Sequence, residues 1–106
     1  MLHSISARHV NEVVIRTSMT SICPLTKTTD FYELTLSYTP RDGKYLELSS
    51  LKEFLESFRD KEVFHEDLAS VIAESVCKEI LAENVNVELK STFLGMEVTI
   101  VKILKC

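Results

Sequence analysis

The stretch EDLASVIAESVCKEILAENVNVELK at residues 66–90 decides the fold class of this 106-residue chain. Its first part, residues 66–83, repeats apolar side chains at helical spacing, which predicts a helix with one face in a core. The residues expected on that face are Leu68, Ala69, Val71, Ile72, Ala73, Val76 and Ile80. Residues 85–90 then alternate apolar with polar side chains, as in a strand with one buried face. A helix followed directly by such a strand indicates helices packed on a sheet.

The rest of the chain supplies a second helix and further extended segments. A helix is predicted to begin near Ser50 and to end at 59–61, because Ser50 and Glu53 have capping-box spacing and an apolar stripe follows. Strands are predicted at 9–22, 31–38, 85–90 and 97–105, with a short extended piece at 45–48 and connections at 39–44 and 94–96. This order predicts an α+β fold, a four-stranded antiparallel sheet with two helices on one face (ββααββ).

Composition and charge limit the classes of protein that this chain can represent. With 45% hydrophobic and 26% charged residues, it suits one globular domain spanning residues 1–106. No long apolar run predicts a membrane span or a secretory signal. The two glycines leave neither of the glycine-rich phosphate-binding motifs. The net charge of −4 argues against binding nucleic acid by overall charge alone.

The cysteines and histidines predict neither a disulfide framework nor a metal site. Cys23, Cys77 and Cys106 form no CxxC pair and no even set, so we expect free thiols and a reducing, cytoplasmic location. Cys77 is expected to pack in the core, and Cys106 to fray at the chain end. The three histidines are scattered, and therefore no metal is predicted.

Cys23 and Asp30 are the residues most suited to chemistry. Cys23 ends the first long strand, because Pro24 cannot extend a ladder, and it is either a small buried hydrophobe or a reactive thiol. Asp30 follows seven residues later, across the loop PLTKTT, and is either a turn residue or a carboxyl that returns to face the sulfur. A thiol and a carboxyl in contact would share a proton, which suits attack on an atom whose neighbour needs protonation.

Three further polar residues have a structural and a functional interpretation. Glu47 lies in the apolar segment 45–48, and it either faces solvent or holds a donor pair such as the edge of a guanine-like base. His65 and Glu66 open the second helix, where an acidic residue also interacts favourably with the helix dipole.

Together these residues resemble the 7-cyano-7-deazaguanine reductase (QueF) family of the tunnelling-fold superfamily. The resemblance is carried, in order and in spacing, by TSICPLTKTTDF at 20–31, ELSSLKEFLESFRD at 47–60 and FHED at 64–67. It implies a tunnelling fold (T-fold) that assembles into oligomeric barrels, as a pentamer or decamer, with the site at a subunit interface. Such a homo-oligomer also agrees with the two open edges of a four-stranded sheet.

The resemblance implies a role for each candidate residue. Cys23 matches the nucleophile that attacks the nitrile carbon to give a thioimide, and Asp30 matches the group that protonates the nitrile nitrogen. Glu47 and Glu66 match the carboxylates that hold the deazaguanine edge, and His65 matches their neighbour near the reacting group. Thiolate attack with proton donation converts a poor electrophile into a reactive one.

The chain departs from the reductases where they bind NADPH. Ser49 stands at a family lysine, although Lys52 remains, and TFLGME at 92–97 stands at a basic Pro-Arg-Gly-Gly stretch. These changes remove the positive charge that a dinucleotide phosphate needs. The pattern resembles the archaeal QueF-like amidinotransferases, in which ammonia opens the thioimide on a tRNA bearing 7-cyano-7-deazaguanine in its D-loop, giving archaeosine. We therefore expect no organic cofactor, and ammonium as co-substrate.

Two other functions stay open on the sequence alone. One is an NADPH-dependent 7-cyano-7-deazaguanine reductase of queuosine biosynthesis that uses other phosphate contacts, such as Lys52, Arg59 or Lys61. Another is a non-catalytic tunnelling-fold module that binds a purine-like ring through Glu66. For a tRNA partner, a local basic zone near the site is expected from Arg8, Arg16, Lys27, Arg41 and Lys44.

Overall fold

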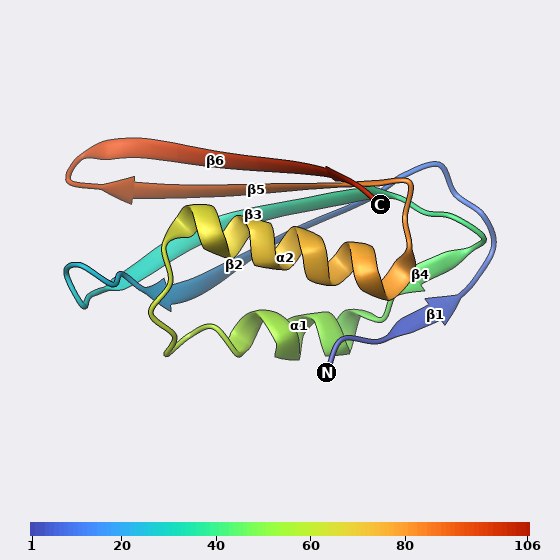
Figure 1. Cartoon of the computed structure of the whole chain (residues 1–106), viewed down its shortest axis with the longest axis horizontal. Helices are drawn as coiled ribbons and strands as arrows, with labels where there is room; N and C mark the ends of the chain where they lie inside the picture. The colour runs from blue at the N-terminus through green and yellow to red at the C-terminus, as the bar shows by residue number, and fades with distance from the viewer.

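The computed structural model describes residues 1–106 and contains two helices and two antiparallel sheets (Figure 1). In chain order the elements are β1 (Ser4–Ser6), β2 (Val13–Ile22), β3 (Thr29–Thr39), β4 (Lys44–Leu46), α1 (Leu48–Glu56), α2 (His65–Ile80), β5 (Asn84–Phe93) and β6 (Met96–Lys105). The main sheet has four strands in the order β2-β3-β5-β6, all antiparallel. The predicted α+β architecture is confirmed, and the additional β1–β4 pair was not predicted.

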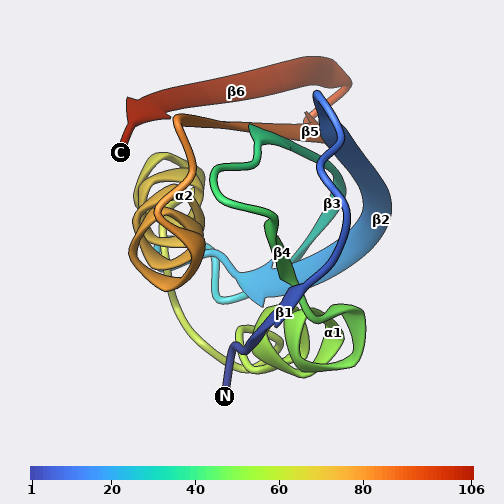
Figure 2. The same ribbon diagram turned by 90° about the vertical axis from the view of Figure 1, so that its right-hand side faces the viewer.

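The sheet curves around both helices, which lie on its concave side (Figure 2). The core is formed where inward-facing side chains of β3 and β5 meet the buried stripe of α2. Val71 was expected in that stripe, but it is 38% exposed because it lies about 200° around the helix from the buried Ala69. No helix is both long and apolar enough to cross a membrane.

Several helices and strands begin or end at other residues than the sequence predicted. The strand expected from residue 9 begins at Val13, because the backbone N–H of Val10 donates to the Tyr45 hydroxyl (2.9 Å) and not to a ladder. The helix expected to reach residue 83 ends at Ile80, where Leu81 adopts a left-handed conformation with φ 49°. The extended piece expected at 45–48 is the strand 44–46.

The predicted capping box at the start of α1 is wrong. The N-cap is Glu47, whose carboxylate accepts hydrogen bonds from the backbone N–H groups of Ser49 (2.8 Å) and Ser50 (2.9 Å). The Ser49 hydroxyl also donates to this carboxylate, and its bond is the largest cause of a lowered pKa of Glu47. The two backbone bonds add to the lowering, because all three stabilise the charged form. The Ser50 hydroxyl instead accepts from the backbone N–H of His3 (2.8 Å). An acidic residue three positions earlier therefore supplies the cap.

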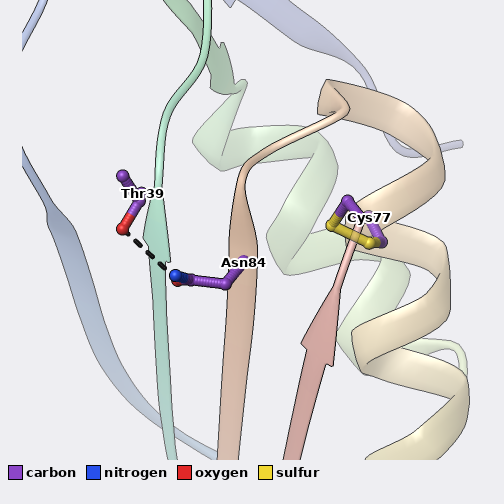
Figure 3. Close-up of a disulfide and its surroundings, with 4 residues drawn as sticks. Thr39, Cys77 and Asn84 are labelled. Carbon is purple, nitrogen blue, oxygen red and sulfur yellow. Dashed lines mark hydrogen bonds between the residues drawn. A yellow bond between two sulfur atoms is a disulfide. The ribbon is translucent and has the colours of Figure 1, made fainter.

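The expectation of three free thiols is also wrong, because Cys77 and Cys106 form a disulfide (Figure 3). It joins the last turns of α2 to the end of β6, across a sequence separation of 29 and a Cα–Cα distance of 5.5 Å. The Thr39 hydroxyl donates to Oδ1 of Asn84 (3.3 Å) at the same end of the sheet. The pairing depends on β6 running back along α2, which cysteine spacing does not reveal. A reducing compartment therefore does not follow from the cysteines.

Candidate active site

The two hairpins of the main sheet diverge at the end opposite the disulfide. β3 pairs with β5 only as far as Glu33 and Lys90, whereas β2–β3 and β5–β6 remain paired up to their own turns. Residues 29–32 and 91–93 therefore face an opening in the sheet. The first turn of α2 lies at this end of the molecule (Figure 1).

A cavity of about 300 Å³ lies at the opening and collects four of the five candidate residues. Cys23 comes from the loop after β2, Asp30 from the start of β3, and His65 and Glu66 from the first turn of α2. The side chains come from elements far apart in the sequence. The structure thus brings together a thiol, two carboxyls and an imidazole in one hollow.

The cavity has further lining residues that the sequence did not single out. They are Pro24, Leu25, Thr26, Phe64, Ser91 and Phe93. Phe64 and Phe93 are 43% and 36% exposed, so their rings offer apolar surface to a bound molecule. Phe64 could have been found from the sequence, because it directly precedes the candidate residue His65 in the motif FHED. Phe93 carried no such signal, because an aromatic residue at the end of an alternating strand is ordinary.

The Cys23 loop is a tight, hydrogen-bonded turn. The backbone N–H of Cys23 donates to the Thr28 carbonyl (2.8 Å), and that of Lys27 donates to the Cys23 carbonyl (2.9 Å). Lys27 has a left-handed backbone, with φ 59°. Hydrogen bonding by the Thr26 side chain, then by the backbone of Thr26 and Leu25, lowers the pKa of the Cys23 thiol. The loop therefore favours the thiolate, which is the nucleophilic form.

Asp30 stands beside this thiol. Its negative charge raises the pKa of Cys23, but this effect is smaller than the lowering by the loop. Asp30 is half-buried and lies opposite Ser21 in the β2–β3 ladder. A carboxyl close to a thiol with a lowered pKa can exchange protons with it or with a bound molecule.

The segment between the helices brings the start of α2 to the cysteine loop. Ile22 donates its backbone N–H to the Lys61 carbonyl (2.9 Å) and accepts from the N–H of Val63 (3.1 Å). An ion pair between Lys27 and Glu62 (2.6 Å) joins the same two segments. This short parallel pairing places the residues that follow it, at the start of α2, beside the thiol. No local pattern in the sequence predicts the pairing.

His65 and Glu66 form the mouth of the cavity on the α2 side. Nε2 of His65 lies 3.2 Å from Oε2 of Glu66, and their side chains are 30% and 65% exposed. α2 has no side-chain cap, so its first backbone N–H groups favour negative charge nearby. An exposed carboxylate here is available to accept hydrogen bonds from a ligand.

Glu47 lies away from the cavity of its own chain. The Tyr38 hydroxyl accepts from the backbone N–H of Leu46 (3.1 Å), which places Glu47 near Tyr38. Tyr38 is eight residues along β3 from Asp30, or roughly 27 Å at the rise of a strand. Glu47 binds the start of α1 instead, and contact with a substrate at Cys23 would need a second copy of the chain.

The expected basic zone does not form around the cavity. Of its five residues, Lys27 adjoins the site, and its charge is paired with Glu62. Arg16 lies in the middle of β2, opposite Thr35. Arg41 and Lys44 lie beyond the far end of β3, and at that end the Arg8 carbonyl accepts a hydrogen bond from the Tyr45 hydroxyl. Clustering of these residues in the sequence does not correspond to clustering in space.

The divergent four-stranded sheet, its two helices and the thiol–carboxyl cavity define a tunnelling-fold protein. A family model described as QueF-like protein matches residues 29–101. The chain therefore belongs to the QueF-like protein family, as its motifs predicted.

Two relatives match most of the chain. It is 36% identical over 89 residues to an archaeosine synthase of Pyrobaculum calidifontis, which covers 84% of this chain and 81% of that protein. A crystal structure of the archaeosine synthase QueF-Like in the apo form matches with a TM-score of 0.87 and 33% identity, covering 91% of this chain and 95% of the other.

Reductases match over a shorter stretch. The NADPH-dependent 7-cyano-7-deazaguanine reductase of Bacteroides thetaiotaomicron is 46% identical over 59 residues, which covers 56% of this chain and 38% of that protein. The corresponding reductase of Granulibacter bethesdensis is 51% identical over 57 residues, covering 54% and 37%. The likeness to the synthases thus extends along more of the chain.

Proposed function

We propose that this protein is an archaeosine synthase, an amidinotransferase that converts 7-cyano-7-deazaguanine in the D-loop of a tRNA to archaeosine. The observation that carries the proposal is the cavity that unites the Cys23 thiol, whose pKa is lowered, with Asp30. The match to archaeosine synthases over 84% of the chain in sequence and 91% in structure supports the same assignment.

The first chemical step joins the enzyme to the base. The Cys23 thiolate attacks the nitrile carbon, so a C–S bond forms while one π bond of the nitrile breaks. The nitrile nitrogen takes a proton from Asp30, which has previously accepted the thiol proton. The product is a covalent thioimide, and no electrons are gained or lost overall.

The second step exchanges sulfur for nitrogen. Ammonia adds to the thioimide carbon to give a tetrahedral intermediate, and Asp30 accepts a proton from the added nitrogen. The C–S bond then breaks, Cys23 leaves as thiolate, and the base carries an amidine. The balance is one nitrile plus one ammonia, with neither hydride nor metal in the scheme.

The rest of the cavity suits a flat heterocycle. In the proposal, Glu66 accepts hydrogen bonds from the N–H and amine edge of the base, with His65 beside the reacting group. The exposed rings of Phe64 and Phe93 offer stacking surfaces to that heterocycle. Glu47 joins the site from a neighbouring copy in a homo-oligomer whose sheet continues across the open edges of β2 and β6.

The surface next to the cavity is balanced in charge within one copy of the chain. A groove of about 850 Å³ continues from the cavity and shares Asp30, Ser91 and Phe93 with it. The charged side chains of the groove are equal in number by sign: Lys52, Arg59 and Lys90 against Asp30, Glu33 and Glu56. One copy therefore offers no strongly basic track for phosphates.

A product assay tests the proposal. Purified enzyme is given tRNA bearing the nitrile base, with ammonium in one reaction and NADPH in another. The RNA is then digested, and the nucleoside masses are measured by mass spectrometry. Gain of one ammonia, lost in Cys23→Ala and independent of NADPH, is expected.

The alternative is an NADPH-dependent nitrile reductase. Lys52 and Arg59, which line the groove next to the cavity, are the cations available for a dinucleotide phosphate. Gain of four hydrogens with NADPH, and no product with ammonium, would establish the reductase and overturn the amidinotransferase.

A further inference from the structure

Tyr32 is a buried polar residue in contact with Asp30, the proposed proton donor. It is 2% exposed, and its hydroxyl donates to Oδ2 of Asp30 (3.3 Å). The two side chains lie on the same face of β3, because they are two residues apart in a strand. The next inward-facing residues of β3, Leu34 and Leu36, are apolar. Tyr32 thus departs from a hydrophobic pattern where the strand meets the cavity.

The surroundings of Tyr32 keep it a hydrogen-bond donor. Burial, with smaller contributions from the charge of Asp30 and the hydrogen bond to it, raises the pKa of Tyr32 to about 12, so the phenol keeps its proton at working pH. Ser21 is fully buried opposite Asp30, and its hydroxyl reaches no group in hydrogen-bonding geometry. The hydroxyl that holds the carboxyl of Asp30 is therefore that of Tyr32.

We propose that Tyr32 is a positioning residue that acts on the reaction through Asp30. Its hydroxyl holds Oδ2, which leaves Oδ1 to exchange protons with Cys23 and the nitrile nitrogen. A carboxylate otherwise turns readily about its last side-chain bond, and misplacement of a reacting group by 1 Å slows a reaction by about 100-fold. This inference rests on the proposed function.

The variant Tyr32→Phe removes the hydroxyl and keeps the ring. Without ammonium, formation of the adduct on Cys23 is followed by intact-protein mass on tRNA bearing the nitrile base, at several tRNA concentrations. We expect the limiting rate to fall by about 10-fold or more, since that is the usual weight of a hydrogen bond to a charged group. The tRNA concentration for half-maximal rate should change little.

Two matched variants separate positioning from packing. Tyr38→Phe removes an equally buried hydroxyl on the same face of β3, bonded to the backbone of Leu46, and should leave the limiting rate unchanged. Because Leu46 precedes Glu47, any effect of this variant should appear in the tRNA concentration for half-maximal rate. In an Asp30→Asn background, Tyr32→Phe should cause no further loss, because its partner is already altered.

Three results would overturn the inference. These are a wild-type rate in Tyr32→Phe, an equal loss in Tyr38→Phe, or an equal further loss from Tyr32→Phe in the Asp30→Asn background. Absence of any adduct on the wild-type protein would instead overturn the proposed function, and the inference with it.

Discussion

The two ends of α2 are held in different ways. At its C-terminal end, Cys77 is joined to Cys106, and the backbone N–H groups of Leu81 and Cys106 donate to the carbonyls of Cys77 (2.9 Å) and Glu83 (3.3 Å). At its N-terminal end there is no side-chain cap, and the nearby Lys27–Glu62 ion pair is exposed. The C-terminal end of α2, which we call the closed end, is thus stabilised covalently. The N-terminal end, which we call the open end, lies beside the reactive groups.

The largest expected effect is the loss of chemistry at the open end. Cys23→Ser should reduce product formation by about 10⁴-fold or more, because a serine hydroxyl beside the same carboxyl is far less acidic than a thiol and a far weaker nucleophile. The thermal midpoint should stay near that of the wild type, since Cys23 is not part of the buried core. Product mass and a melting curve on the same preparation measure both. A large drop in the midpoint would show that the two ends are not separate.

The next effect is a loss of stability at the closed end. Cys106→Ser opens a disulfide that spans 29 residues and should lower the free energy of unfolding by about 3.5 kcal/mol on the chain-entropy model. Urea unfolding measures this loss, and a reductant should bring the wild type to the same midpoint. Adduct formation well below the midpoint should be unchanged. If it falls in proportion to stability, the ends are coupled through α2.

A smaller effect concerns the pH at which Cys23 reacts. Thr26→Ala removes the largest cause of the lowered pKa of Cys23, so that pKa should rise toward its ordinary value. Alkylation of the thiol by iodoacetamide, followed against pH, should therefore have its midpoint at higher pH in the variant. Thr35→Ala, in the middle of β3, serves as the matched control. An unchanged midpoint in Thr26→Ala would show that the loop does not activate the thiol.

The smallest effect is expected at the cap of α1. The pKa of Glu47 is lowered in the folded protein, so its stabilising contribution is present above its unfolded pKa and is lost as the pH falls through the folded value. Glu47→Gln should cost less stability than Cys106→Ser, and the cost should disappear in acid. Thermal midpoints between pH 3 and pH 7 test this. A cost that persists in acid would assign the loss to packing.

The sequence alone predicted the local features well. The alternation in β3 and β5 and the apolar stripe of α2 identified the sheet and its helix, because each pattern follows from one element's own periodicity. The loop from Cys23 to Asp30 was also accessible, since a strand end and a short loop constrain where the chain returns.

The features that depend on long-range register were not predictable in this way. The disulfide needs β6 to end beside Cys77, and the cavity needs the β3–β5 ladder to stop at Glu33 and Lys90. The three-residue strand β1 gave no signal, because its partner β4 lies about forty residues away. Such contacts follow from how complete elements pack, which no local pattern records.

A peptide map of the protein after reaction with nitrile-bearing tRNA, in the absence of ammonium, tests whether Cys23 forms the covalent adduct. We expect one added mass, equal to the substrate after nuclease trimming, on the peptide that contains Cys23. Addition of ammonium should discharge it and release archaeosine. No adduct, or product formed at full rate by Cys23→Ala, would contradict the assignment of the open end of the sheet as the site of the chemistry.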